Sequence, residues 1–189
     1  VVRIEVFQGS CPGCYMYALP NAIEIYKNNS RDDVVVLGLA TAFEDYDKNT
    51  LDNLKLLLTS GKVIGETFNA LSQYRQLVDG DKLNYKIPFP VAMDVLRKNT
   101  QDFTDNNVID FIESNINNYN SYSEPDKKVL FERVKQYLKN KKYSALTFDE
   151  YKLQGTPSAI LVDKKGNLRN VFFGANSNLH GLVKQLVNE

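Results

Sequence analysis

Both cysteines of the chain fall within four residues, Cys11-Pro12-Gly13-Cys14. Residues 3–7 before them are apolar and β-branched, as in a strand, and the residues after them repeat apolar side chains at helical spacing. The pair therefore lies where a strand turns into a helix. Two cysteines and one histidine are too few for a disulfide scaffold or for a zinc site of Cys and His alone, which needs about four ligands. Both kinds of cross-linked small fold are excluded.

The first 42 residues predict a βαβ unit, because a second apolar run at residues 33–41 follows the helix. This run is suited to a strand that is buried on both faces. Parallel strands joined by a helix cross over with a right hand, which places their ends and the Cys pair at one edge of the sheet.

Three further strands are predicted. Residues 87–94 contain two prolines, which cannot donate to a strand ladder, so this segment is expected at a sheet edge. Residues 158–162 and 168–173 flank a turn sequence typical of an antiparallel hairpin. The last helix is expected to begin at a cap on Ser177. The fold class is α/β, with a central mixed sheet of about five strands flanked by helices.

The remaining residues form two mostly helical insertions within a single domain of residues 1–189. The first insertion, residues 43–85, has predicted helices at 51–59 and 66–78. The second, residues 95–147, has predicted helices at 106–116 and 124–138.

The charge balance gives no reason to expect nucleic acid as a partner, because the chain has 23 basic and 23 acidic side chains and no formal net charge. Apolar runs are far shorter than the roughly 20 residues that span a bilayer, so no membrane span is expected. The chain begins at Val1, without a secretion signal, and targeting cannot be read from it. We expect a soluble monomer of bacterial type, from either the cytoplasm or the periplasm.

The position of the Cys pair favours thiol chemistry. A thiol attacks only as the thiolate, and a cysteine at the start of a helix faces unpaired N–H groups and the positive end of the helix dipole. Cys11 is therefore the predicted nucleophile, with Pro12 suited to the first helical turn, and Cys14 is the more buried resolving thiol. The structural alternatives are half of a metal site or two unrelated buried thiols.

A second motif, Gly155-Thr156-Pro157, supports the interpretation of the Cys pair as a redox site. Residues 155–157, Gly-Thr-Pro, directly precede a predicted buried strand, where a cis proline can begin the strand and a plain strand-entry proline is the alternative. The Cys11 to Cys14 motif, the segment from Phe89 to Asp94 and the segment from Gly155 to Leu168 together resemble the thioredoxin superfamily. Within it they are most similar to the TlpA-like and redoxin-type thiol-disulfide oxidoreductases.

This resemblance implies that the Thr156–Pro157 bond is cis and packs beside Cys11. It also implies that Thr156, Pro157, Pro12 and Gly13 contact an extended substrate segment. Glu5 matches the position of a buried acid that helps to move the proton of the second cysteine. The alternative is that Glu5 is merely exposed near the start of its strand.

The sequence departs from the family in several places. Ser10 replaces the aromatic residue that commonly precedes the first cysteine, and Pro-Gly replaces Gly-Pro within the motif. Pro20 interrupts the helix and is expected to kink it, because the Met16 carbonyl loses its partner. The second insertion stands where DsbA-like disulfide oxidases carry a helical domain. It forms either a cap over the active site or a stabilising elaboration away from it.

The leading hypothesis is a thiol-disulfide oxidoreductase without cofactor or metal. With no third cysteine, its Cys11–Cys14 pair exchanges electrons with protein dithiols or disulfides and with an external redox partner. One alternative is a peroxiredoxin-like thiol peroxidase, although Gln8 occupies the place of the usual Thr or Ser. Another is a Sco-type copper-binding protein, which needs a longer Cys spacing and a histidine. His180, the only histidine, is more simply a solvated helix side chain.

Overall fold

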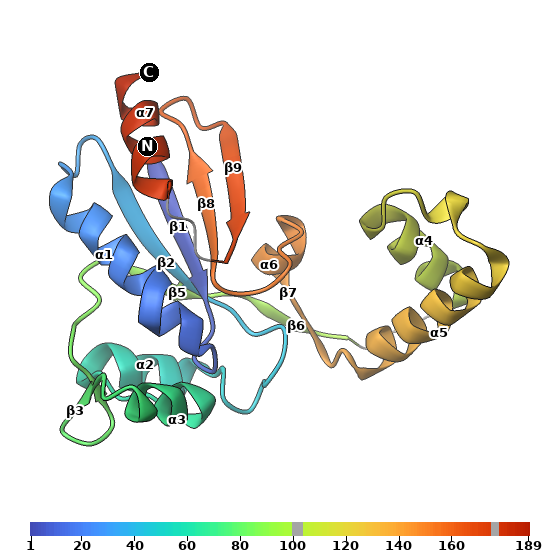
Figure 1. Cartoon of the computed structure of the whole chain (residues 1–189), viewed down its shortest axis with the longest axis horizontal. Coiled ribbons are helices and arrows are strands. Elements are labelled where there is room, and N and C mark those ends of the chain that lie inside the picture. Colours follow the sequence, from blue (N-terminus) through green and yellow to red (C-terminus); the bar gives the residue numbers. More distant parts are fainter. Residues whose placement is uncertain (100–103, 175–177) are drawn as a thin grey trace. The chain divides into compact units, whose positions relative to one another are not determined.

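The computed structural model describes residues 1–99, 104–174 and 178–189. The chain divides into two compact units, which are described separately: residues 1–95 with 145–189, and residues 96–144. Figure 1 shows the elements of both units in chain order.

A five-stranded mixed sheet forms the centre of the first unit, as predicted. Its strand order is β5-β2-β1-β8-β9, with β1 (Val2–Phe7) in the middle. β1 pairs in parallel with β2 (Val35–Ala40), and β2 pairs in parallel with β5 (Val91–Met93) at the edge. β8 (Ser158–Val162) runs antiparallel to β1 and forms the predicted hairpin with β9 (Leu168–Phe173).

The prediction that β2 is buried on both faces is wrong. Val36 is buried, whereas the neighbouring Val35 is 41% exposed. Along β2 the side chains alternate, so that one face is buried and the other is exposed at Val35 and partly exposed at Leu37 and Leu39.

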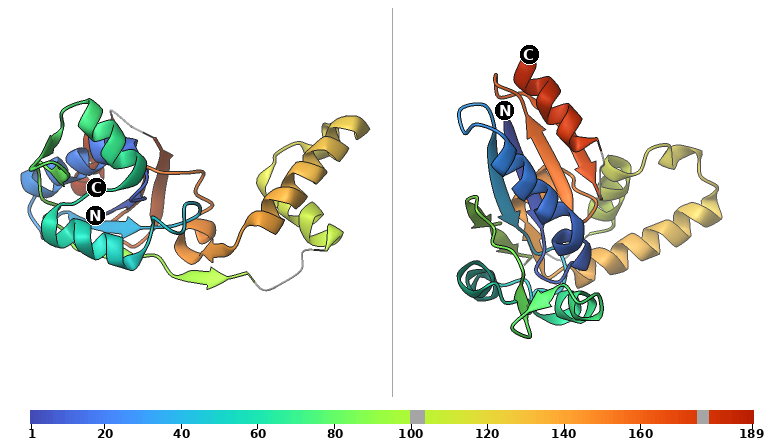
Figure 2. Two further views of the ribbon diagram at one scale, coloured as in Figure 1. Left: turned by 90° about the horizontal axis from the view of Figure 1, so that it is seen from below. Right: turned by 60° about the vertical axis from the view of Figure 1, so that its left-hand side comes forward.

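Helices α1 (Leu19–Asn28) and α7 (Leu179–Asn188) lie on the same face of the sheet, as the right-hand view of Figure 2 shows. They bury a row of apolar side chains against it, which includes Leu19, Ile23, Val183 and Leu186. This burial supplies the hydrophobic stabilisation that holds β1 and its carboxyl end in place. The cap expected at Ser177 lies outside the described residues.

The predicted interruption at Pro20 takes the form of one π-helical turn, η1 (Cys14–Ala18). Pro20 has no N–H for the Met16 carbonyl, and the Leu19 N–H donates to the Cys14 carbonyl five residues back. The helix therefore restarts at Leu19, directly after the segment that holds the cysteines.

The first insertion contains α2 (Leu51–Ser60) and α3 (Gly65–Gln73). The Thr50 side chain accepts a hydrogen bond from the Asn53 N–H and caps α2, which ends at Gly61 with a left-handed φ of 76°. The prediction that the second helix reaches residue 78 is wrong. Arg75 adopts a left-handed φ of 54°, and the chain turns into the small hairpin of β3 (Leu77–Val78) and β4 (Lys82–Leu83).

The second insertion leaves and returns at one place on the first unit. The Leu146 N–H donates to the Val95 carbonyl, at 2.9 Å. The buried Asp94 carboxylate accepts the N–H groups of Thr147 and Phe148, at 2.9 and 3.0 Å, where α6 (Leu146–Glu150) begins. The core sheet therefore tolerates a long insertion between β5 and β8, because its two ends are tied together.

Residues 96–144 form their own small core. α4 (Asp105–Asn115) and α5 (Glu124–Asn140) bury Val108, Ile112 and Leu138. A short helix, η2 (Tyr119–Ser121), joins them, and β6 (Leu96–Lys98) pairs with β7 (Tyr143–Ala145). That this insertion caps the active site stays a prediction.

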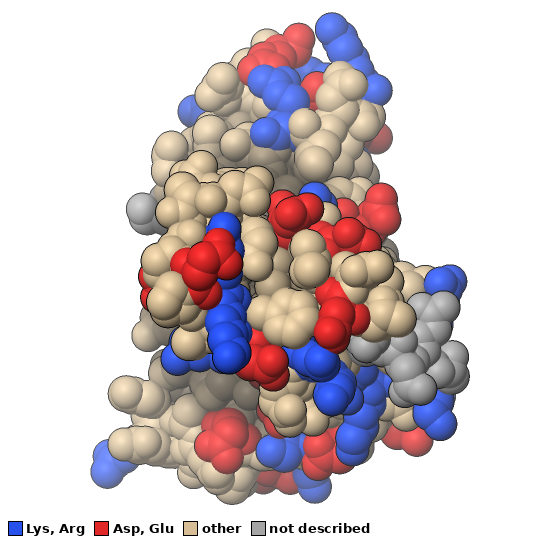
Figure 3. All heavy atoms as spheres, turned by 90° about the vertical axis from the view of Figure 1, so that its right-hand side faces the viewer, with Lys and Arg blue, Asp and Glu red and all other residues tan. Residues whose placement is uncertain are grey.

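Acidic and basic side chains are interspersed on the face in Figure 3. Within the described ranges, no helix is long and apolar enough to cross a membrane.

The contact between β2 and β5 predicts a stability effect at Gly38. A Cβ there would lie 2.9 Å from Val91 Cγ2 and 3.2 Å from the Phe89 ring. Gly38→Ala should therefore lower the free energy of unfolding in urea by about 1–3 kcal/mol. Val35→Ala, at an exposed position of the same strand, should change it by no more than about 0.5 kcal/mol. Equal stability of both variants would contradict this pairing.

Candidate functional site

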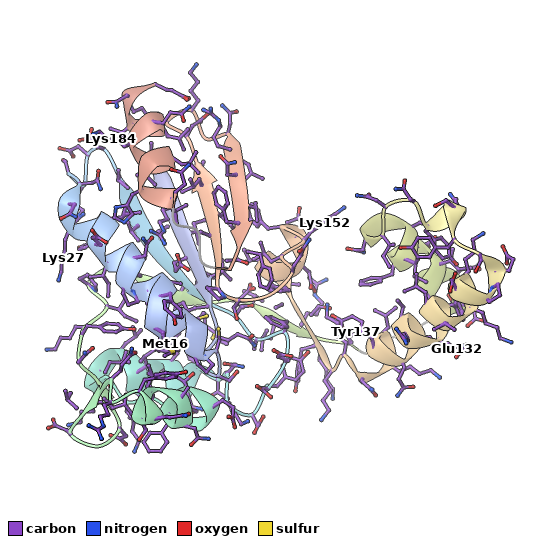
Figure 4. The ribbon with its side chains drawn as sticks, viewed as in Figure 1. Met16, Lys27, Glu132, Tyr137, Lys152 and Lys184 are labelled. Carbon is purple, nitrogen blue, oxygen red and sulfur yellow. The ribbon has the colours of Figure 1, made fainter. Side chains whose placement is uncertain are left out.

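The Cys pair lies in a tight turn after β1. The Cys11 N–H donates to the Gln8 carbonyl at 3.2 Å, and the Cys14 N–H donates to the Cys11 carbonyl at 3.1 Å. Cys11 is partly exposed, whereas Cys14 is fully buried. Met16, labelled in Figure 4, lies on the turn of η1 that follows. This is the strand-to-helix position that the sequence predicted.

The two thiols are in direct contact. Cys14 Sγ is the donor and Cys11 Sγ the acceptor of a hydrogen bond between them. This contact lowers the pKa of Cys11 to about 6, although desolvation opposes the shift, and the nearby Thr156 side chain lowers it further. Backbone N–H groups at the start of the helix add to the same effect. Cys11 is therefore the more acidic thiol, as a nucleophile at this position should be.

Cys14 has the opposite shift. Burial raises the pKa of Cys14 well above its ordinary value, and its hydrogen bond to Cys11 raises it further. Cys14 therefore keeps its proton while Cys11 is a thiolate. The two sulfurs titrate as a coupled pair in which the exposed one ionises first.

Thr156 and Pro157 lie beside the Cys pair. The Thr156–Pro157 bond is cis, and the Thr156 carbonyl lies 3.4 Å from Cys11 Sγ. A Cβ built on Gly13 would lie 3.9 Å from the Pro157 ring, so these two residues are neighbours across the site. Pro12 lies between Cys11 and Gly13 and is partly exposed. The structure thus brings these predicted site residues together.

Glu5 is buried in β1, with 1% of its surface exposed, so the alternative of an exposed Glu5 is wrong. Burial raises the pKa of Glu5, whereas the Arg3 guanidinium opposes this shift from 2.5 Å away. The charge of Cys11 also raises the pKa of Glu5, which means that the carboxyl and the thiol influence each other.

The sequence analysis missed the partner of Glu5. Arg3 is as deeply buried as Glu5 and also donates to Asn21 Oδ1 on α1, at 2.8 Å. The available signal was the spacing, because residues i and i+2 of a strand point to the same face. A pocket of about 480 Å³ is lined by both residues and by Tyr17 and Glu24.

Polar side chains of the first insertion hold the turn before Cys11. Asn49 Oδ1 accepts the Ser10 N–H at 3.1 Å, and Thr67 Oγ1 donates to the Gly9 carbonyl at 2.8 Å. On the other side of the motif, the Tyr85 hydroxyl donates to the Tyr15 carbonyl at 2.7 Å. The sequence showed these residues only as part of an insertion, because nothing local indicates which distant backbone groups they bind.

His180 does not join the cysteines. It lies on α7, where its Nε2 is 3.6 Å from Glu24 Oε2 of α1. Among the residues that the structure describes, no group of three His, Cys, Asp or Glu side chains is arranged to hold a metal ion.

The fold has counterparts among solved structures. A thiol-disulfide isomerase from Corynebacterium glutamicum superimposes with a TM-score of 0.58 at 26% identity, over 100% of this chain and 80% of that one. The chain has the thioredoxin-like fold. A thioredoxin-like superfamily protein also matches, with a TM-score of 0.56 and 26% identity over the same shares of the two chains. No protein-family model matches the sequence, and no curated protein matches it significantly.

The contact between the thiols predicts how Cys11 reacts. Alkylation of Cys11 should reach half its maximal rate near pH 6, because only the thiolate attacks. In Cys14→Ala this midpoint should move to higher pH, since the largest cause of the lowered pKa is removed. Cys14→Ser keeps a hydroxyl donor and should move it less. Mass spectrometry after brief exposure to iodoacetamide measures all three. An unchanged midpoint in Cys14→Ala would contradict the assignment.

The buried ion pair predicts unequal costs for removing its two members. Glu5→Leu leaves Arg3 permanently charged without its carboxylate and should cost about 3–5 kcal/mol. Arg3→Met should cost less near pH 5, because the buried Glu5 can take up a proton. In Arg3→Met the pKa of Glu5 in the folded protein should rise further, because the guanidinium that opposed the shift is gone. The stability of this variant should therefore fall as the pH rises through that pKa and Glu5 ionises.

Urea unfolding at pH 5 and pH 8 measures these costs. The double variant Arg3→Met/Glu5→Leu should be more stable than Glu5→Leu alone. Additive losses in the double variant would show that the two side chains act independently.

Proposed function

We propose that this protein is a thiol-disulfide oxidoreductase that acts on protein dithiols or disulfides through the Cys11–Cys14 pair. The observation that carries the proposal is the direct contact between two thiols with opposite pKa shifts. With a pKa of about 6, roughly nine-tenths of Cys11 is thiolate at pH 7. The sequence motifs favour the TlpA-like and redoxin-type branch within the thioredoxin-like fold.

The reaction proceeds in two exchanges. The Cys11 thiolate attacks one sulfur of a substrate disulfide, the substrate S–S bond breaks, and a substrate thiolate leaves. Cys14 then loses its proton and attacks Cys11 in the mixed disulfide, which releases the second substrate thiolate and leaves a Cys11–Cys14 disulfide. The substrate gains two electrons and the protein loses two. An external dithiol restores the pair, and the reverse order of steps oxidises a substrate.

The surroundings of the pair fit each step. Thr156, two residues before β8, offers its backbone beside Cys11 to an extended substrate segment, as in short strand addition. Pro12 and Gly13 lie beside the same segment, with Gly13 next to the Pro157 ring. Glu5, buried and electrostatically coupled to Cys11, is assigned the role of exchanging the proton of Cys14.

The two alternative functions have less support. In a thiol peroxidase the residue three places before the nucleophile offers a hydroxyl to peroxide, whereas Gln8 is engaged with Thr156 and Glu44. For a copper carrier, the only histidine lies on α7 beside Glu24 and does not join the cysteines. Peroxide consumption by the reduced protein, or retention of one Cu(I) against a chelator, would favour these functions instead.

Single substitutions at the two cysteines test the proposal. With a disulfide-containing peptide as substrate and dithiothreitol as reductant, Cys11→Ser should abolish turnover because no nucleophile remains. Without dithiothreitol, Cys14→Ser should form a mixed disulfide between Cys11 and the peptide and stop there, because no second thiol is present to resolve it. Mass spectrometry without reductant detects this adduct. Full turnover by either variant would exclude the mechanism.

A further inference from the structure

Gln8 is a buried amide immediately after β1, and only 1% of its surface is exposed. Its side chain joins two segments that are distant in the sequence. Nε2 donates to the Glu44 carbonyl at 3.2 Å, and Oε1 accepts from Thr156 Oγ1 at 3.3 Å. Its own backbone carbonyl accepts the Cys11 N–H. One residue therefore links the nucleophile, the first insertion and the segment before β8.

The orientation of this amide follows from its partners. A backbone carbonyl can only accept, so the Glu44 oxygen must face the NH₂ group of Gln8 and the acceptor Oε1 must face Thr156. Asn49 Nδ2 donates to the same Glu44 carbonyl at 3.1 Å, while its Oδ1 accepts the Ser10 N–H. Both amides thus donate to the Glu44 carbonyl, while the oxygen of Asn49 binds the turn before Cys11 and the oxygen of Gln8 binds Thr156.

The hydrogen bond to Gln8 restrains the residue that lies against the nucleophile. The Thr156 carbonyl is 3.4 Å from Cys11 Sγ, and the Thr156 hydroxyl is held by Gln8 Oε1. A rotation of Thr156 would break the second contact. A buried amide that lost this bond would also keep an unpaired acceptor, which is costly.

We propose that Gln8 is a positioning residue for the substrate: it fixes Thr156 in the orientation that pairs with an extended peptide segment next to Cys11. The inference rests on the proposed function. Gln8 touches neither substrate nor the reacting sulfur of a substrate disulfide, and it acts through Thr156. A small disulfide that reacts directly with the thiolate needs no such pairing.

The first test compares two substrates. Gln8→Met keeps the length of the side chain and removes both of its hydrogen bonds. It should raise KM for a disulfide-containing peptide about tenfold, the effect of one lost hydrogen bond of about 1.4 kcal/mol. The rate with a small aromatic disulfide should change less than twofold. Gln73→Met, on the exposed surface of α3, should leave both substrates unaffected.

The second test is rescue by a variant of the same shape. In Gln8→Glu a protonated carboxyl can donate to the Glu44 carbonyl and accept from Thr156, whereas an ionised one can only accept. The ratio of the KM of Gln8→Glu for the peptide to the wild-type KM at the same pH should therefore approach one as the pH falls. Cys11 and Cys14 titrate beside this position, so their alkylation is followed in the same samples.

The third test is a double-mutant cycle with Thr156→Val, which removes the hydroxyl and keeps the backbone. Gln8→Met should add little to the KM of Thr156→Val if the two act through one hydrogen bond. Should Gln8→Met fail to fold by circular dichroism, Gln8→Leu completes the cycle, because it also removes the acceptor of the Thr156 hydroxyl.

Each contrary outcome is distinct. Three results would overturn the positioning role and leave the wild-type activity as proposed. They are an equal loss of activity of Gln8→Met with the peptide and the small disulfide, additive effects on KM in the double-mutant cycle, and a KM of Gln8→Glu that is raised equally at every pH. If the wild type reduces no peptide disulfide and Cys14→Ser traps no adduct, the proposed function itself has failed.

Discussion

The hydrogen bond from the Cys14 thiol to the Cys11 sulfur is the interaction on which the site depends. It makes one of two chemically identical thiols acidic and keeps the other protonated. That difference needs Cys14 buried and Cys11 at the surface, within one turn of chain. The turn satisfies this because it follows β1, the central strand of the sheet, and the π-helical turn begins at the buried Cys14.

Buried polar side chains hold this arrangement, each from a different part of the chain. Asp94 ties the ends of the second insertion, Arg3 pairs with Glu5 inside β1, and Gln8 and Asn49 bind the loop that begins the first insertion. Such groups stabilise a fold only when they are partnered, so each specifies the position of the segment it binds. The first insertion is therefore part of the support of the active-site turn.

Much of the fold could be predicted because its signals are local. The strand before Cys11, the hairpin of β8 and β9 and the cap at Thr50 follow from alternation, turn residues and side-chain capping. The predicted helix through residue 78 failed because the left-handed Arg75 ends it, and no glycine or proline marks that place. In the site, Cys11, Cys14 and Pro157 stand in recognisable motifs. Arg3 and Gln8 do not, since their roles depend on contacts with Glu5 and Thr156 that appear only in the folded chain.

The central claim is that Cys11 and Cys14 form a reversible two-electron couple within one molecule. The direct measurement is a redox titration against glutathione or dithiothreitol buffers, with the disulfide followed by mass spectrometry. The lowered pKa of Cys11 stabilises the reduced form and lies between the values of about 7 for thioredoxin and about 3.5 for DsbA. We therefore expect one transition, independent of protein concentration, between about −270 mV and about −120 mV. A pair that forms no internal disulfide at any potential, or only one between molecules, would contradict the account.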